Sequence, residues 1–382
     1  MKKKILFTAS IAKHIIRFHL PYLQWFKNQG FETHVACSGE EEIPFTDFKH
    51  NVPFIRNPFS YGHARAYKCL ETLIDENDYF LIHCHTPMTS VLTRLAARTA
   101  RLKGTKILYT AHGFHFFKGG PIHYWFTYFP IELFLSKYTD AIITINEEDY
   151  QIIKREESVQ TKVFKIPGVG VSQKRFFPVH SDIKTQIRTK NNFSDQDFIL
   201  VYAAEFIPRK NHVFIIKSAG KLIESLPNVK ILFAGRGILK AGMEKLVSEL
   251  GLNETIIFLG FREDIDEVFK MSDIGISASR QEGLGLNLVE EMMCGLPIVA
   301  TQDKGHLEVI DHGLNGFLFS QNDSSGFINH ILDLYLNEEM KSNMSKEAIL
   351  KSKKFELSNS LYEMEKIYSL YLKQDQVKDE LS

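Results

Sequence analysis

Short apolar runs alternate with segments of helical period along almost the whole chain. KKILFTAS, FETHVACSG, YFLIHCHTP, TKILYTAHG and DAIITIN each have the length of a buried strand, and segments such as HLPYLQWFKNQG lie between them. Parallel strands must be joined by crossovers of a dozen or more residues, usually helices. The alternation therefore predicts an α/β protein whose parallel sheets are covered by helices.

The strand series starts again in the second half, with DFILVYAAEF, VKILFAGRG, TIIFLGF, DIGISAS and LPIVAT. A chain of 382 residues with 44% hydrophobic content is long enough for two cores. The Gly- and Pro-containing stretch KIPGVGVSQKRFFPVHSD lies between the two series and is typical of a linker. We expect two Rossmann-like domains, residues 1–170 and 171–358. After Gly316 the chain is expected to be mostly helical, with a helix of about 359–382 packing back on the first domain.

Charge and cysteine content favour a cytoplasmic protein. Lys+Arg and Asp+Glu both number 46, so no global field attracts nucleic acid. The four cysteines lack paired spacing, which suits a reducing compartment without disulfides. The start MKKKILFTAS lacks the long apolar core and cleavage site of a signal peptide, and no run of about 18 apolar residues predicts a membrane span.

Two glutamates flank a glycine-bearing loop in RQEGLGLNLVEEMMCG, which follows a predicted strand. Glu282 lies in the loop and Glu290 about two turns into the next helix. Gly283 and Gly285 allow close approach to the backbone, and the helix start attracts an anion. A carboxylate repels phosphate, so we expect the glutamates to accept hydrogen bonds from sugar or ribose hydroxyls. The spacing also fits a helix cap and a solvated face made by Glu290 and Glu291.

A basic pair follows the first strand of the second domain. Arg209 and Lys210 in AEFIPRKNHVF stand before a helix, where two cations can neutralise a diphosphate. An exposed basic turn without a ligand is the alternative interpretation.

Four short motifs together resemble retaining glycosyltransferases of family 4, which have the GT-B fold of two Rossmann-like domains facing each other across a cleft. The motifs are E-x7-E from Glu282 to Glu290, Arg209-Lys210 after Glu205, His112-Gly113 after a strand, and Asn315-Gly316. KHIIRFHLPYL and IHCHTP in the first domain look most like bacterial transferases that assemble capsular or exopolysaccharide repeat units.

The resemblance implies a role for each matching residue. Glu290 would hold the ribose hydroxyls, and Glu282 would hydrogen-bond hydroxyls of the transferred sugar. Arg209 and Lys210 would bind the diphosphate. His112 would approach the donor sugar from the first domain and position it in the transition state.

The resemblance also implies further donor contacts from two loops. Backbone N–H groups of the glycine loop would bind the sugar and diphosphate, and residues after two other strands would line the base pocket. These positions are Gly283, Leu284, Gly285 and Leu286 in the glycine loop, and Gly235, Arg236, Phe261 and Arg262 at the base pocket.

The loop after the first strand departs from the family pattern. Many members have a glycine pair there, whereas this chain reads SIAKHIIRFHL. Ala12–His14 is expected to fill the place of the glycines as a loop, with Lys13 or His14 contacting phosphate or acceptor.

The implied reaction is retaining transfer of a sugar, with same-face attack assisted by the leaving phosphate. The donor is expected to be a UDP-sugar, and the acceptor a polyprenyl-linked or growing saccharide in surface polysaccharide biosynthesis. Cations and helix N–H groups can stabilise the leaving diphosphate, and no Asp-x-Asp motif in a cleft loop indicates a divalent ion. We therefore expect neither a cofactor nor a metal. A UDP-sugar 2-epimerase of the same fold and a degenerate non-catalytic subunit are the alternatives.

The histidines after two predicted strands have plausible metal-ligand chemistry, but polar lining of an active site explains them without a metal. They are His83, His85, His112 and His115. Cys84 alternates with two of them and is expected to point to the other face, into the core. The chain lacks a complete G-x-G-x-x-G fingerprint, which argues against a dinucleotide oxidoreductase.

Aromatic residues concentrate between His115 and Tyr138, near Lys118 and Lys137. The segment fits either core packing of the first domain or a surface that dips into lipid headgroups, where Trp and Tyr are favoured. A basic helix could add attraction to anionic lipid through Arg94, Arg98, Arg101 and Lys103. We expect peripheral association with the inner face of the cell membrane.

Overall fold

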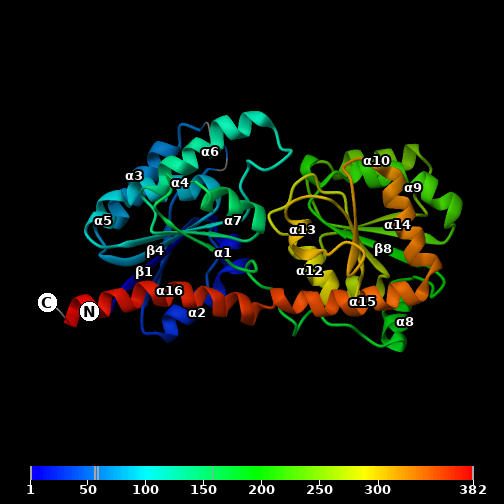
Figure 1. The fold of residues 1–382 in the computed structure, drawn as a ribbon. Helices are drawn as coiled ribbons and strands as arrows, with labels where there is room; N and C mark the ends of the chain where they lie inside the picture. Colours follow the sequence, from blue (N-terminus) through cyan, green and yellow to red (C-terminus); the bar gives the residue numbers. More distant parts are fainter. Residues whose placement is uncertain (1, 56, 58–59, 157, 381–382) are drawn as a thin grey trace. The chain divides into compact units, whose positions relative to one another are not determined.

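The computed structural model describes residues 2–55, 57, 60–156 and 158–380, and of residues 373–380 it describes only the backbone. The chain forms two compact units: Met1–Gly170 with Ser358–Ser382, and Val171–Leu357 (Figure 1). Each unit is built around one parallel sheet, of seven strands in the first and six in the second. The predicted α/β class is confirmed.

The first sheet has the strand order β3-β2-β1-β4-β5-β6-β7. Its central strands are buried on both faces, which is why they read as continuous apolar runs rather than alternating ones. The strands are β1 (Lys4–Ile11), β2 (Glu32–Ser38), β3 (Phe48–Asn51), β4 (Tyr79–His85), β5 (Lys106–Ala111), β6 (Ala141–Thr144) and β7 (Lys162–Lys165).

Helices from both ends of the chain belong to the first unit. The C-terminal helix α16 (Leu357–Glu380) runs alongside α2 (Figure 1), where the Tyr368 ring stacks on Trp25 and the Tyr371 hydroxyl donates to the carbonyl of Asp140 at 3.0 Å. The other helices are α1 (Ala12–Phe18), α2 (Leu20–Asn28), α3 (His63–Asp75), α4 (Pro87–Ala96), α5 (Arg98–Leu102), α6 (Ile122–Ser136) and α7 (Glu147–Lys154).

The second sheet has the order β10-β9-β8-β11-β12-β13. Its strands are β8 (Phe198–Ala203), β9 (Val229–Ala234), β10 (Ile256–Gly260), β11 (Ile274–Ser277), β12 (Ile298–Thr301) and β13 (Gly316–Phe319). The helices are α8 (Ser181–Lys190), η1 (Pro208–Lys210), α9 (His212–Ser225), α10 (Lys240–Glu249), α11 (Ile265–Met271), α12 (Leu286–Met293), α13 (His306–Val309), α14 (Ser324–Leu336), α15 (Glu338–Ser352) and η2 (Lys353–Phe355).

The direction of chain progression reverses once in each sheet. In the first it reverses between β1 and β4, and in the second between β8 and β11. Ligands of open α/β sheets bind outside the carboxyl ends of the strands at such a switch point. The loops that follow these four strands are therefore the first places to look for a site.

The structure corrects three expectations about elements. Ala12–His14 is not a loop, because helix α1 begins at Ala12 directly after β1. The largely helical region after Gly316 contains strand β13, and the sequence patterns also missed β3 and β7. These three strands have four residues each and lie at sheet edges. Edge strands bury less surface than central ones, so they lack the apolar runs that reveal central strands.

Candidate active site

The switch point of the second sheet brings together the predicted basic pair and one of the two glutamates. Arg209 Nη1 lies 3.0 Å from Glu282 Oε2, and Lys210 Nζ donates to the other oxygen of the same carboxylate. Glu282 is only 7% exposed. Burial alone would raise the pKa of Glu282, but the charges of Lys210 and Arg209 lower the pKa to about 2. Lys210 is therefore largely buried against the carboxylate, whereas the Arg209 side chain is 42% exposed, as an exposed turn would have it.

Hydrogen bonds tie the two loops together. The backbone N–H of Arg280 donates to the carbonyl of Arg209 at 2.9 Å. The Tyr202 hydroxyl, from β8, donates to the carbonyl of Lys210 at 2.8 Å and lies 2.9 Å from Ser279 Oγ. Because these bonds join the ends of β8 and β11, the cations are held by the sheet rather than by a mobile turn.

A third loop, which the sequence patterns did not single out, packs against Glu282. A side chain at Gly305 would meet Glu282 Cβ at 2.7 Å, so the backbone after β12 approaches closely. Asp303 Oδ1 accepts from the N–H groups of Gly305 and His306, at 2.7 and 3.1 Å, and fixes the turn. The available signal was the polar stretch QDKGH directly after LPIVAT, at the carboxyl end of a strand.

The glycine loop before α12 has the conformation that a glycine permits. Gly285 has φ +86° at the start of the helix, and a Cβ there would lie 3.3 Å from the His306 ring. Gly283 is half-buried, and Leu284 is buried beneath the loop. Leu286 begins the helix, so the N-terminal N–H groups of α12 follow the loop directly.

The two glutamates of α12 differ in environment. Glu290 is half-buried, whereas Glu291 is fully buried and packs close to Gly275, and burial raises its pKa. Consecutive helical residues point about 100° apart, so one can face a binding site while the other faces the sheet. The alternative that places both on a solvated face is therefore wrong for Glu291.

The four residues predicted to line the base pocket lie at the carboxyl ends of β9 and β10. The Gly235 N–H donates to the carbonyl of Gly260 at 2.7 Å, and the Arg236 guanidinium lies 5.0 Å from the centre of the Phe261 ring. Arg262 forms two hydrogen bonds to Asp264, at 2.6 and 2.7 Å. A side chain at position 235 would overlap the carbonyl of Ala204, which explains the glycine. Phe261 is 58% exposed and is available for stacking.

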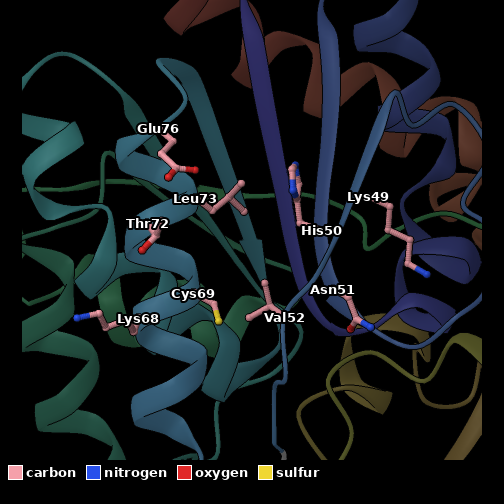
Figure 2. Close-up of a pocket in the computed structure, with 9 residues that line it drawn as sticks. All are labelled: Lys49, His50, Asn51, Val52, Lys68, Cys69, Thr72, Leu73 and Glu76. Carbon is pink, nitrogen blue, oxygen red and sulfur yellow. The ribbon is translucent and has the colours of Figure 1, made fainter.

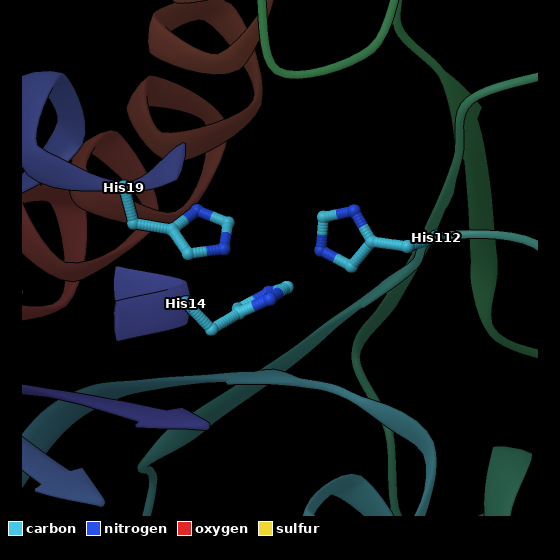
Figure 3. Close-up of side chains that lie close together, drawn as sticks. All are labelled: His14, His19 and His112. Atoms are coloured by element: carbon cyan, nitrogen blue, oxygen red, sulfur yellow. The ribbon is translucent and has the colours of Figure 1, made fainter. Parts of the chain in front are cut away.

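In the first unit, His112 follows β5 and lies beside His14 and His19 (Figure 3). The histidine set considered from the sequence is not the set that the fold assembles. His83 is hydrogen-bonded to Tyr368 and Thr110, and His115 stacks on Tyr128. His83 and His85 are buried, and Cys84 between them lies in the core, as expected. Helices cover both faces of this sheet, so alternation along β4 does not separate core from surface.

Helix α6 carries the aromatic segment and is divided between core and solvent. Trp125 and Phe129 pack against buried Phe116, whereas four apolar side chains are exposed. They are Ile122 (73%), Phe126 (76%), Ile131 (45%) and Phe134 (50%). Core packing therefore describes one part of the segment, and the exposed apolar side chains leave contact with lipid a prediction.

The basic helix offers fewer charges to a lipid surface than expected. Arg94 is fully buried and bonded to Glu132 of α6 at 2.8 Å, and Arg101 pairs with Asp140 at 3.1 Å. Arg98 and Lys103 are exposed. Among the residues that the structure describes, no helix is long and apolar enough to cross a membrane.

A shallow pocket lies between β3 and α3 in the first unit (Figure 2). It contains none of the predicted site residues. Its lining is Lys49, His50, Asn51, Val52, Lys68, Cys69, Thr72, Leu73 and Glu76.

Comparison with known proteins identifies the family. Residues 183–351 match the model of glycosyl transferases group 1, and residues 4–146 match the glycosyl transferase 4-like model. The chain is 42% identical to putative glycosyltransferase EpsD of Bacillus subtilis over 98% of both chains. The protein belongs to the group 1 glycosyltransferases. This membership confirms the predicted enzyme class and does not favour the epimerase or the non-catalytic subunit.

Further similarities to this glycosyltransferase cover nearly the whole chain. The α-1,3-galactosyltransferase of Escherichia coli that acts on GlcNAc-diphosphoundecaprenol is 26% identical over 93% of this chain and 92% of its own. Sucrose-phosphate synthase of Thermosynechococcus elongatus superposes with a TM-score of 0.81 at 16% identity, covering 98% and 100%. Anabaena HepE in complex with UDP and glucose gives 0.77 at 20% identity, covering 96% and 99%. These neighbours confirm the GT-B fold.

Proposed function

We propose that this glycosyltransferase moves a sugar from a UDP-sugar to a polyprenyl-linked or growing saccharide acceptor in surface polysaccharide biosynthesis. The observation that carries the proposal is the convergence of Arg209 and Lys210 on buried Glu282 at the switch point of the second sheet. The relatives support the substrate classes, since HepE was crystallised with UDP-glucose and the E. coli relative acts on a diphosphoundecaprenol-linked sugar. Residues 171–358 would bind the donor, and residues 1–170 the acceptor.

The cation pair supplies the main catalytic contribution. Cleaving the bond to a nucleoside diphosphate builds negative charge on the leaving phosphate, and preorganised cations stabilise it without a metal. Arg209 binds through its planar fork and Lys210 as a point charge. The transfer retains the anomeric configuration, with same-face attack assisted by the leaving phosphate.

Glu282 both holds the cations and contacts the sugar. Without a donor its buried carboxylate neutralises the two cations, which keeps them close together. When the diphosphate takes over the cations, oxygens of Glu282 become available to the hydroxyls of the transferred sugar. The leaving-group site is therefore preformed before the donor binds.

The other donor contacts follow from the remaining loops. Glu290 accepts from the ribose hydroxyls, and Phe261 with Arg236 stacks on the base. Backbone N–H groups between Gly283 and Leu286 bind the sugar and diphosphate. His112 of the first unit positions the donor sugar.

Calorimetric titration of UDP in buffer with EDTA tests the donor assignment, with ADP and GDP as controls. We expect selective UDP binding that is weakened in Arg209→Ala and unchanged in Lys245→Ala, which removes an exposed lysine from α10. Equal binding of the three nucleotides, or none, would contradict the assignment. Screening UDP-sugars against polyprenyl-linked saccharides then tests the transfer itself.

The exposed face of α6 supports contact with a lipid surface. Ile122, Phe126, Ile131 and Phe134 lie within one half of the helix circumference, and exposed Lys118 and Lys137 lie just beyond the helix ends. Exposed apolar side chains on one half of a helix, with flanking cations, suit the headgroup region of anionic lipid, where a polyprenyl-linked acceptor is found. The protein would thus work peripherally at the inner face of the cell membrane.

Co-sedimentation with phosphatidylglycerol vesicles tests this contact. The double variant Phe126→Asp, Phe134→Asp should lose most of the vesicle binding. Leu336→Asp is the matched control, because Leu336 is 77% exposed at the end of α14 in the other unit. Equal vesicle binding by both variants would show that α6 is not the contact.

A further inference from the structure

The switch point of the first sheet gathers histidines from three separate segments. His14 and His19 follow β1, His85 ends β4, and His112 follows β5. The ring centres of His14 and His112 lie 5.1 Å apart, and those of His14 and His19 also 5.1 Å. His85 stacks on His19 at 3.7 Å. The fold therefore concentrates imidazoles at the place where an open α/β sheet holds its ligand.

His19 lacks the partners that a buried imidazole requires. Its side chain is 0% exposed, and neither of its ring nitrogens has a hydrogen-bond partner among the described residues. Both ring nitrogens of His85 and Nε2 of His112 also have no hydrogen-bond partner among the described residues. A buried polar group without a hydrogen-bond partner destabilises the fold, so several together indicate an additional occupant.

A metal ion is the occupant that such a cluster of imidazoles fits. Histidine is the commonest metal ligand in proteins, because a ring nitrogen can offer its lone pair to the ion. His14, His19 and His112 lie beside one another and each supplies one such nitrogen (Figure 3).

We propose that His14, His19 and His112 form a binding site for a divalent transition-metal ion, with Zn²⁺ as the preferred metal. One ring nitrogen from each residue lies within 4.8 Å of the other two, and Figure 3 shows the rings turned toward one another. Tetrahedral Zn²⁺ with Zn–N bonds of about 2.0–2.1 Å places its ligand nitrogens about 3.3 Å apart, which small side-chain rotations achieve.

The all-imidazole ligand set selects the metal class. Imidazole suits Zn²⁺, Cu²⁺ and Ni²⁺, whereas Mg²⁺ and Ca²⁺ prefer oxygen ligands. Three histidines leave a fourth position open to water or another ligand. The site would join α1 to the loop after β5 and orient the His112 ring. It is independent of the donor diphosphate contacts, which the second unit supplies through Arg209 and Lys210.

Metal uptake by the full chain tests the proposal. Protein stripped with EDTA and then exchanged into chelator-free buffer is titrated with Zn²⁺ by calorimetry, and the bound metal is counted by mass spectrometry. We expect one Zn²⁺ per chain and a higher melting temperature. Substitution with Co²⁺ should give the visible absorption of a tetrahedral centre.

Two variants and a control separate binding from folding. His19→Gln and His14→Gln should each weaken Zn²⁺ binding by at least about 10-fold, the smallest effect typical even of changes beyond the direct ligands. His14 is half-buried, so His14→Gln keeps the test valid should His19→Gln fail to fold. His123→Gln, in exposed α6 sequence, should bind like the unaltered protein.

The outcomes distinguish this proposal from the transferase assignment. No stoichiometric Zn²⁺ uptake, or equal uptake by His14→Gln and the unaltered protein, would overturn the metal site and indicate a water-filled histidine pocket. UDP binding in EDTA depends on the second unit, so loss of one result leaves the other intact.

Discussion

The two sheets place opposite chemistry at equivalent topological positions. At the switch point of the second sheet, a buried carboxylate carries two cations, and its pKa is lowered to about 2. At the switch point of the first, buried imidazoles have lowered pKa values and remain neutral. Burying charge is costly unless it is paired, so the second switch point pairs its charges, whereas the imidazoles at the first carry none.

The two switch points suit different ligands, because one offers positive charge and the other offers neutral imidazoles. The paired cations can exchange the carboxylate for a diphosphate without a change in the loops, because Tyr202 and Arg280 hydrogen-bond to the backbone carbonyls of the two cationic residues. Neutral imidazoles have little attraction for phosphate and suit a metal ion or hydroxyl groups. The shared topology thus determines where each site lies, and the residues after the strands determine what it binds.

The buried pair of Arg94 and Glu132 should give the largest effect. It shows whether the first unit, whose switch point carries neutral imidazoles, also depends on paired charges elsewhere. Replacing one partner leaves the other buried and unpaired. Arg94→Met should lower the free energy of unfolding by about 3–5 kcal/mol, measured by urea denaturation. Arg98→Met, on the exposed start of α5, should change it little. If the double variant Arg94→Met, Glu132→Leu is no more stable than Arg94→Met, the loss does not arise from the unpaired carboxylate.

Glu282 should make the second unit sensitive to acid. Its lowered pKa means that its contribution to stability is present above about pH 4.5 and is lost as pH falls from there toward about 2. The shift from 4.5 to about 2 corresponds to about 3 kcal/mol. Urea denaturation at several pH values should show a correspondingly weaker acid dependence in Glu282→Gln than in the unaltered protein. Glu254→Gln, at an exposed position, should retain the full dependence.

Arg209 should matter for turnover more than for folding, because its side chain is 42% exposed while its charge reaches the carboxylate. Arg209→Ala should lower kcat by about 10² or more if the guanidinium stabilises the leaving diphosphate. The measurement is steady-state transfer from the UDP-sugar found by screening. A kcat within a few-fold of that of Lys245→Ala would show that the cation pair is structural.

Glu290 should give the smallest effect of the series. Its proposed hydrogen bonds to ribose contribute about 1.5 kcal/mol, so Glu290→Ala should weaken UDP binding about 10-fold with little change in kcat at saturating donor. Calorimetric titration of UDP and steady-state kinetics give the two quantities. If Glu290→Ala binds UDP as tightly as the unaltered protein, Glu290 does not contact the donor. The difference between the two sheets would then rest on Glu282 and its two cations alone.

The predictable part of the site lies close to the strand ends. Arg209, Lys210 and Glu282 were found from the sequence because each follows a recognisable strand and has the charge that a diphosphate or a sugar requires. The position of His306 beside Gly285 was not found. Its segment has no motif of its own, and only the packing of the loop after β12 brings it to the site.

Sequence alone determined the α/β class, the restart of the strand series and the loops with chemical potential, because central parallel strands are buried on both faces and must read as apolar runs. Tertiary structure decided which distant side chains meet. His14, His19 and His112 are brought together by strand order, and Arg94 reaches Glu132 only because α4 and α6 pack together. Periodicity reports how each residue is oriented on its own element, whereas contacts between elements depend on sheet order and packing.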